Sequence, residues 1–314
     1  MLKNISLSQL TSHLLMIRPV AFGFNTETAL NNHFQQNCGN MDPAQTQRSA
    51  ISEFDALATK LEYAGVDITI VNDTVSPSTP DSIFPNNWVS FHKGGTVVLY
   101  PMFAKNRRAE RRIDILETLQ NKGTVINRII DLTDPESDNR YLEGTGSMVL
   151  DRDKRMAYAC ISERTDQKIL ENWAKAMGYT IVSFHADQLV KGKAKPIYHT
   201  NVMLSIGEDV SVICSDSISN SEEREKVLLS LKRNGKDVIE ITQEQTSHFV
   251  GNMLQVKTRV GDRLMVMSTR AFNNLTSHQV KRIENTSRII HSPLDTIETL
   301  GGGSARCMLA EIFC

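Results

Sequence analysis

Between residues 84 and 130 the pattern of apolar and polar positions changes twice. Residues 84–102 alternate around the pair Gly94–Gly95, which predicts a β-hairpin. Residues 106–123 then place Ile113, Leu116 and Leu119 on one face and charge on the other, which predicts an amphipathic helix ending near Gly123. Residues 124–130 are rich in β-branched side chains and predict a strand. The predicted order is strand, strand, helix, strand.

The same order returns three more times along the chain. Hairpins are predicted at 142–160, 199–216 and 251–268, helices at 166–178, 221–235 and 277–287, and strands at 179–186, 236–242 and 288–293. At the N-terminus, 16–25 and 66–71 are strand-like and 49–65 is helical, and we expect the strand 308–314 to complete this unit's hairpin. Five ββαβ units predict an α/β fold with radial repetition around one axis, closing a single domain over residues 1–314.

Polar residues recur at the start of each predicted hairpin. The positions Asn87, Glu143, His199, Asn252 and Cys307 are successively 56, 56, 53 and 55 residues apart, and Asn25 stands near the equivalent place in the first unit. Radial repetition would point all of these side chains into one central cavity. A structural core would place Val, Leu and Ile there, so a thiol, an imidazole, a carboxylate and amides indicate a catalytic site.

Three of these residues are candidates for catalysis. Cys307 follows Gly301-Gly-Gly303, a backbone that can approach a ligand closely, whereas a small buried thiol is the ordinary role that we assign to Cys38, Cys160, Cys214 and Cys314. An isolated histidine is more often structural, but His199 is in register with Cys307. Glu143 precedes Gly-Thr-Gly and could simply cap a turn; the alternative is that it orients an imidazole.

Further residues are candidates for substrate binding. Asn86 and Asn87 lie in Phe84-Pro-Asn-Asn-Trp88, where the structural alternative is an Asx-turn and the functional one is a pair of amides in the cavity wall. Arg164 and the pair Arg107–Arg108 follow the second strands of their hairpins. Each is either a solvated arginine or a forked donor for a substrate carboxylate.

Composition narrows the class of protein. The chain has 314 residues, 35 basic and 36 acidic side chains, and a formal charge of −1, so no charge excess indicates a nucleic-acid partner or a polybasic membrane contact. Five widely spaced cysteines include no CxxC and no zinc-ligand spacing, which favours a reducing compartment. With no signal-peptide pattern and no long apolar run, we expect a cytoplasmic protein with no membrane contact.

The motifs together resemble the guanidine-group-modifying superfamily, which contains arginine deiminases, dimethylarginine dimethylaminohydrolases and amidinotransferases. The resemblance covers roughly residues 15–313 and rests on Glu143-Gly-Thr-Gly, His199-Thr-Asn, Ser162-Glu-Arg-Thr and Gly301-Gly-Gly-Ser-Ala-Arg-Cys307. It is closest to the citrulline ureidase branch. The resemblance implies a five-bladed α/β propeller with pseudo-fivefold symmetry, and a site without metal or organic cofactor. It implies Cys307 as nucleophile, His199 as general acid/base and Glu143 as the partner that orients His199.

Two departures from the family pattern bear on the substrate. Arginine-acting members carry a carboxylate at the positions of Asn87 and Asn201, where it pairs with the guanidinium. A buried guanidinium facing neutral amides would lose its ionic partners, whereas a ureido group is neutral and complements an amide. Ser147, near where many relatives have Asp, further reduces the negative charge. We therefore expect citrulline as the substrate.

Three other functions remain open at this point. One is a deiminase or dimethylargininase acting on arginine-type substrates, and another is an amidinotransferase that needs an acceptor amine. The third is a non-catalytic ribosome-binding protein with the same fold, although a binding protein has no reason to align Cys307, His199 and Glu143. A homo-oligomer also remains open.

Overall fold

The computed structural model describes residues 8–37 and 42–313, and most of the elements predicted above are present in it. The strand predicted at 16–25 is instead His13–Arg18 and ends before Pro19, which has no N–H to donate to a sheet. The strands form five three-stranded sheets and one two-stranded sheet within the described ranges. The five larger sheets are β17–β1–β2 (Ala310–Ile312, His13–Arg18, Asp67–Asn72), β3–β4–β5 (Val89–His92, Thr96–Leu99, Arg128–Asp131), β6–β7–β8 (Met148–Asp151, Met156–Cys160, Thr180–Phe184), β11–β12–β13 (Leu204–Ile206, Val210–Ile213, Asp237–Glu240) and β14–β15–β16 (Leu254–Lys257, Arg263–Ser268, Arg288–Ser292).

Every one of these sheets has the same internal pattern. An antiparallel pair is followed by a parallel pair, as in β3 with β4 and β4 with β5. The first sheet combines the two ends of the chain, because β17 pairs antiparallel with β1 and β1 pairs parallel with β2. The prediction that the C-terminal strand completes the first unit is therefore confirmed. A closed five-bladed propeller and a single domain stay predictions.

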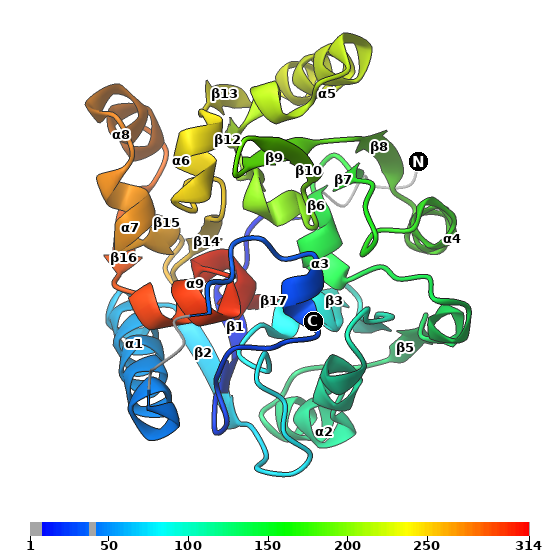
Figure 1. Cartoon of the computed structure of the whole chain (residues 1–314), viewed down its shortest axis with the longest axis vertical. Coiled ribbons are helices and arrows are strands. Elements are labelled where there is room, and N and C mark those ends of the chain that lie inside the picture. The colour runs from blue at the N-terminus through cyan, green and yellow to red at the C-terminus, as the bar shows by residue number, and fades with distance from the viewer. Residues whose placement is uncertain (1–7, 38–41, 314) are drawn as a thin grey trace.

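The longer helices connect parallel strands and lie towards the outside of the molecule, whereas two short ones, Gly144–Ser147 and Asp295–Gly301, lie nearer its centre (Figure 1). The helices are α1 (Pro43–Tyr63), α2 (Ile113–Asn121), α3 (Gly144–Ser147), α4 (Gln167–Met177), α5 (Ser221–Arg233), α6 (Gln243–Ser247), α7 (Thr269–Asn273), α8 (Ser277–Glu284) and α9 (Asp295–Gly301). The amphipathic spacing predicted for α2 is seen in its buried residues Ile115, Leu116 and Leu119. In the described part of the chain no helix is long and apolar enough to cross a bilayer.

Short helical turns precede the first strand of most sheets, and the sequence pattern does not predict them. Glu143 does not open a hairpin directly: helix α3 comes first, and the 3-10 turns Pro85–Asn87, Thr200–Val202 and Ala305–Met308 occupy the same place in other units. A turn of helix directs its polar side chains inwards before the chain extends. The predicted helix 106–123 likewise begins only at Ile113, because Lys105–Glu110 forms a separate 3-10 turn with Arg107 buried.

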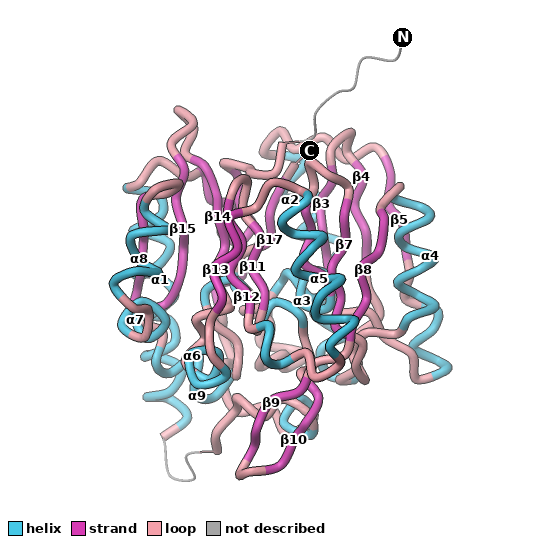
Figure 2. The backbone as a smooth tube through the Cα atoms, turned by 90° about the horizontal axis from the view of Figure 1, so that it is seen from above, coloured by secondary structure: helices cyan, strands magenta, loops and turns pink. Residues whose placement is uncertain are grey.

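A second unpredicted element is the hairpin of β9 (Asp187–Val190) and β10 (Lys193–Pro196). It stands between β8 and His199 in the chain and protrudes at one end of the molecule (Figure 2). Its strands are short and largely solvent-exposed, so no alternation of buried and exposed residues marks them. The sequence pattern therefore carries no signal for it.

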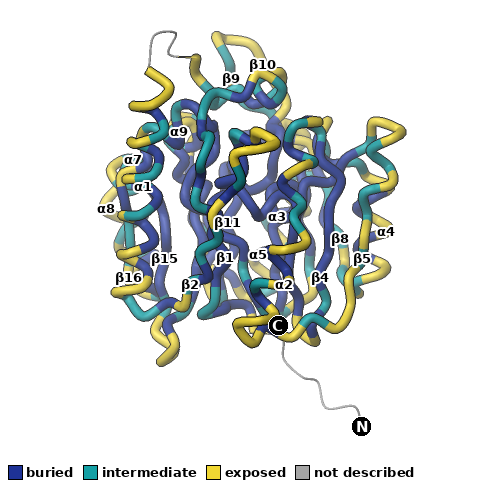
Figure 3. Tube along the Cα trace, turned by 90° about the horizontal axis from the view of Figure 1, so that it is seen from below, coloured by how far each residue is buried: buried dark blue, intermediate teal, exposed yellow. Residues whose placement is uncertain are grey.

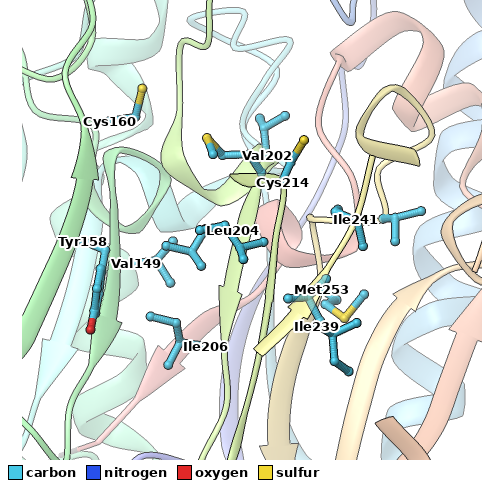
Figure 4. Close-up of a cluster of buried hydrophobic side chains, with 14 of the residues drawn as sticks. Val149, Tyr158, Cys160, Val202, Leu204, Ile206, Cys214, Ile239, Ile241 and Met253 are labelled. Carbon is cyan, nitrogen blue, oxygen red and sulfur yellow. The ribbon is translucent and has the colours of Figure 1, made fainter. Parts of the chain in front are cut away.

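The cores lie between the sheets and their helices. Strand residues are mostly buried and outer helical faces are exposed (Figure 3). The largest cluster joins three neighbouring units through side chains such as Val149, Leu204 and Met253 (Figure 4). Cys160 and Cys214 are buried in this cluster, as predicted, whereas Cys38 and Cys314 lie outside the described residues.

Candidate active site

The candidate catalytic residues converge because each stands just before the first strand of its unit. Cys307 lies in the turn before β17, His199 just before Thr200–Val202, and Glu143 at the N-terminus of α3. They lie at or beside a cavity of about 10 Å³, room for about one water molecule. The cavity is lined by Thr28, Asn32, Asp81, Phe84, Asn87, Arg107, Arg164, Tyr198, His199, Gly301, Gly302, Gly303 and Cys307.

Glu143 and His199 form a buried acid–imidazole pair. The His199 Nε2 atom lies 2.8 Å from Glu143 Oε2, and the Phe103 amide donates to Glu143 Oε1 at 2.9 Å. Burial alone would raise the pKa of Glu143, but the nearby Arg164 charge and the hydrogen bond with His199 hold it below its usual range. Glu143 is therefore a carboxylate, and it accepts a hydrogen bond from the Nε2–H group of His199.

The opposite nitrogen of His199 is the one available for proton transfer. Burial lowers the pKa of His199 to about 4, even though Glu143 opposes this shift, so the ring is neutral at pH 7. With the proton on Nε2, Nδ1 carries the lone pair. Gly146 packs against this side: a Cβ there would lie 2.8 Å from His199 Nδ1 and 2.4 Å from Asn87 Nδ2. Only glycine fits between these two groups.

Amides surround the thiol of Cys307. Asn252 donates from Nδ2 to Cys307 Sγ at 3.2 Å, and Asn201 donates from Nδ2 at 3.6 Å. Burial raises the pKa of Cys307, while the Ser304 and Asn252 hydrogen bonds and the Arg306 charge oppose the rise. Asn252 also donates to the Asn201 carbonyl at 2.9 Å, so one side chain links the thiol to the His199 segment. The repeat register points to Asn252, but it does not predict this contact with the thiol.

Asn87 is held by Arg107 in a single orientation. Arg107 donates from Nη1 to Asn87 Oδ1 at 2.8 Å, and its Nε and Nη2 bond the carboxylate of Glu110 at 2.9 Å each. The Asn87 Nδ2 group has no hydrogen-bond partner among the described residues. Asn87 thus presents a free N–H donor beside His199.

The two adjacent arginines point in different directions. Arg107 is buried and lines the cavity. Arg108 donates to the Met102 carbonyl at 3.2 Å and pairs with Glu136 at 3.3 Å, and it is not part of the cavity lining. Consecutive residues on a 3-10 turn project about 120° apart, so only one of the two can face inwards. The geometry supports Arg107 and not Arg108 as a substrate contact.

Arg164 also lines the cavity and makes contacts on several sides. Its Nη2 donates to the Thr28 carbonyl at 2.9 Å, its Nε to Asn31 Oδ1 at 2.8 Å, and its guanidinium carbon lies 4.8 Å from the Tyr198 ring centroid. It also approaches Glu143 at 3.4 Å. Arg164 therefore ties the segment around Thr28 to the acid–imidazole pair.

Asp81 is a buried carboxylate in the cavity that no sequence pattern indicates. Its Oδ2 accepts from Asn25 at 2.8 Å and from Thr28 at 3.0 Å, and its Oδ1 has no hydrogen-bond partner among the described residues. The prediction that Asn25 binds substrate is not supported, because Asn25 is not part of the cavity lining and instead holds Asp81. Asp81 lies three residues before Phe84 in a loop rich in Ser, Thr and Pro, and no periodicity marks it.

Two other candidates, Phe84 and Asn86, differ in whether they reach the cavity. The Phe84 ring lines the cavity and packs on the glycine run, since a Cβ at Gly301 or Gly303 would come within 2.9 Å of it. The Asn86 side chain is fully buried, and its amide atoms have no hydrogen-bond partner among the described residues. It is not part of the cavity lining. Across the described ranges, no group of His, Cys, Asp and Glu is placed to hold a metal ion.

The fold and these motifs define a member of a known family of guanidine-modifying proteins. Residues 18–314 match the family described as N,N dimethylarginine dimethylhydrolase, eukaryotic. The chain therefore belongs to this family, within the guanidine-modifying pentein superfamily, as the motifs predicted. A comparison with curated proteins returned no match.

Solved structures share the fold at low sequence identity. ArgZ, an arginine dihydrolase from the ornithine–ammonia cycle in cyanobacteria, matches with a TM-score of 0.72 and 17% identity over 96% of this chain and 40% of ArgZ. AgrE in complex with L-arginine matches with a TM-score of 0.72 and 16% identity over 96% of this chain and 40% of AgrE. A dimethylarginine dimethylaminohydrolase adduct with S-methyl-L-thiocitrulline matches with a TM-score of 0.64 and 16% identity over 96% and 100%. This chain thus spans 40% of the length of the two larger proteins.

Proposed function

We propose that this protein is a cysteine-dependent C–N hydrolase that cleaves the ureido group of L-citrulline, giving L-ornithine, ammonia and carbon dioxide. Membership of the family supports hydrolysis of a guanidine-like group. The convergence of Cys307, His199 and Glu143 at one buried site supports a covalent route. The proposal assumes that the five three-stranded sheets form the five blades of a propeller.

The orientation of Asn87 is the observation that carries the choice of substrate. Because Arg107 occupies Asn87 Oδ1, the group that remains for a ligand is the Nδ2 donor. A ureido oxygen accepts such a hydrogen bond, whereas a guanidinium offers only donors and a positive charge. A guanidinium at this place would face an N–H group backed by the Arg107 cation, which is electrostatically unfavourable.

The α-amino and α-carboxylate groups of citrulline match the charged part of the cavity. The unpartnered Asp81 Oδ1 suits an ammonium group, and the Arg107 and Arg164 guanidinium groups suit a carboxylate. Holding both charged groups would fix the ureido carbon near the sulfur, which converts the attack into a positioned, unimolecular step. The charged residues would therefore select an amino acid, and the amides would select its side chain.

The reaction begins with proton transfer from Cys307 Sγ to His199 Nδ1 and attack of the thiolate on the ureido carbon. The oxygen of the tetrahedral intermediate becomes negative and is stabilised by amide donors, for which Asn87 and Asn201 are candidates. His199 then gives its proton to the δ-nitrogen, the C–N bond breaks, and ornithine leaves. An S-carbamoyl group remains on Cys307.

Hydrolysis of this intermediate restores the enzyme. His199 accepts a proton from water as the water attacks the S-carbamoyl carbon. The C–S bond breaks, the thiol regains a proton, and carbamic acid leaves and decomposes to ammonia and carbon dioxide. Throughout, Glu143 compensates the positive charge that His199 acquires.

Substrate entry requires the segment around Thr28 to move. A cavity of about 10 Å³ cannot hold an amino acid, and Thr28, Asn31 and Asn32 close it by contacts with Arg164, Gly301 and Gly302. Opening would have to break these hydrogen bonds and the packing of the Phe34 ring against Tyr198 and Phe249.

A guanidine hydrolase of the arginine dihydrolase or dimethylargininase type is the second candidate. It is favoured by Asp81, whose free oxygen could pair a guanidinium, and by the likeness to ArgZ, an arginine dihydrolase. Separate incubations with L-citrulline, L-arginine and dimethyl-L-arginine, with ornithine, citrulline and ammonia measured, distinguish the two. Ornithine from citrulline and no turnover of the others supports the proposal. Citrulline accumulating from arginine would refute it, and ornithine from arginine would assign the dihydrolase activity.

A further inference from the structure

A second and larger cavity lies at the opposite ends of the strands that begin at the catalytic site. Strands β3, β6, β14 and β17 start beside the catalytic residues, and the residues that end or follow them, His92, Arg152, Lys257 and Phe313, line this cavity. Its volume is about 390 Å³, and it shares no lining residue with the catalytic cavity. The mechanism proposed above uses none of its residues.

A buried arginine forms one wall of this cavity. Arg152 is 4% exposed, and its Nε has no hydrogen-bond partner among the described residues. Its guanidinium carbon lies 4.1 Å from the Phe313 ring centroid, and Nη1 lies 3.3 Å from His92 Nδ1. Stacking on Phe313 and the contact with His92 fix this guanidinium, so its positive charge is held in one place beside the cavity.

The neighbouring carboxylate does not neutralise this arginine. Glu311 Oε2 lies 3.5 Å from Arg152 Nη2 and 3.0 Å from Arg306 Nη2. One carboxylate is thus shared by two buried guanidinium groups, which leaves a net positive charge next to the cavity. A buried excess charge is costly unless a counter-charge reaches it.

Three more cations line the same cavity. Lys93, Arg155 and Lys257 stand at three different strand ends, and no Asp or Glu belongs to the lining formed by the described residues. Cationic walls that converge from separate elements raise the local potential and attract anions of more than one charge. The remaining lining includes Tyr179 and Phe313, so the cavity also has apolar surface for a small organic group.

We propose that this cavity is a binding site for a small multivalent anion, a phosphate group or a compact dicarboxylate, with Arg152 as its central ligand. The Arg152 guanidinium would attract the anion and donate to one of its oxygens, and Lys93, Arg155 and Lys257 would balance its remaining charge. A singly charged anion would leave most of the cationic lining without a partner. The site does not depend on the activity proposed for the catalytic cavity.

Calorimetric titration of the full chain tests this site with three probes: inorganic phosphate, pyrophosphate and succinate, each at constant chloride concentration. We expect saturable binding of one anion per chain by at least one probe, with acetate failing to bind. Phosphate or pyrophosphate binding alone assigns a phosphate site, and succinate binding assigns a dicarboxylate site. If none of the three binds saturably at millimolar concentrations, the proposal is wrong.

Variants of the residues that line this cavity test whether the anion binds there. Lys93 and Arg155 are exposed, so the double variant Lys93→Ala/Arg155→Ala should fold normally and weaken binding about tenfold. The control Lys226→Ala/Lys232→Ala removes two exposed charges from α5 and should leave the affinity within about twofold. Arg152→Lys keeps the charge but loses the planar guanidinium that stacks on Phe313, and should weaken binding further. Equal effects of the two double variants would indicate only diffuse surface attraction and would overturn the site.

Discussion

The candidate active site has two walls that differ in how they handle charge. On one wall, the charged wall, Glu143 pairs with Arg164 and with His199, and Asp81 keeps one carboxylate oxygen without a hydrogen-bond partner among the described residues. On the other wall Asn87, Asn201 and Asn252 are neutral amides placed around the Cys307 thiol and the Arg107 cation. In the proposed function the charged wall holds the amino-acid end of the substrate and moves a proton, whereas the other wall, the amide wall, accepts a side chain without net positive charge.

Of all substitutions at this site, removal of the nucleophile should reduce turnover most. Cys307→Ala should reduce turnover by about four orders of magnitude or more, because no other group can carry the carbamoyl intermediate. Steady-state ornithine release measures the effect, and Cys214→Ala, which removes a thiol from the core, is the matched control and should retain activity. Turnover retained in Cys307→Ala would exclude the covalent route.

The charged wall should make folding sensitive to acid. The folded-state pKa of His199 is about 4, below the usual 6.5, and that of Glu143 is also depressed. Between pH 6.5 and 4 the unfolded chain therefore binds more protons than the folded one, and stability falls as the pH falls. This pair should contribute a loss of about 3 kcal/mol between pH 7 and pH 4.

Urea unfolding at several pH values measures this loss. The double variant Glu143→Gln/His199→Gln removes both titrating groups and should show a smaller decrease in unfolding free energy over the same pH range. An equal decrease in the variant and the parent protein would assign the acid sensitivity to other groups.

Gly146 lies where the two walls meet, so enlarging it should disturb both. Gly146→Ala should lower kcat/KM about a hundredfold, because the added methyl would displace His199 and Asn87 from their positions. Gly23→Ala is a suitable control, since a Cβ there meets no atom within 4 Å. Unchanged kinetics in Gly146→Ala would mean that His199 and Asn87 need not be held so closely.

The contact between Asn252 and the thiol should have a smaller effect. Asn252→Ala removes a hydrogen bond that favours the thiolate, so the pKa of Cys307 should rise and kcat/KM should fall about tenfold. The pH dependence of thiolate absorbance and of alkylation rate reports the pKa, with Asn127→Ala, at an exposed loop, as control. A loss of activity with no change in the thiol pKa would leave Asn252 a purely structural role.

Much of this arrangement could be predicted from the repeat. Because a fixed spacing places equivalent residues at equivalent points of each unit, the positions of Glu143, His199 and Cys307 in the sequence are enough to predict their convergence. The pairing of β17 with β1 follows from counting strands. Long, regular apolar patterns carry this information.

What the sequence could not supply is the direction of individual side chains. Arg107 and Arg108 are adjacent and have identical side chains, so the sequence does not distinguish them. The 3-10 turn Lys105–Glu110 is what directs Arg107 towards the cavity. Asp81 comes from an irregular loop, so no period brings it to the site. Asn25, which the sequence predicts to contact substrate, does not line the cavity and donates a hydrogen bond to Asp81.

The central claim is that the amide wall selects a neutral ureido group, and the ratio of kcat/KM for L-citrulline to that for L-arginine tests it most directly. The parent protein should favour citrulline. Asn87→Asp replaces the free N–H donor by a carboxylate oxygen beside Arg107, and the ratio should fall by about tenfold or more, since a guanidinium would gain an ionic partner. A parent protein that favours arginine, or a ratio unchanged by Asn87→Asp, would contradict the account.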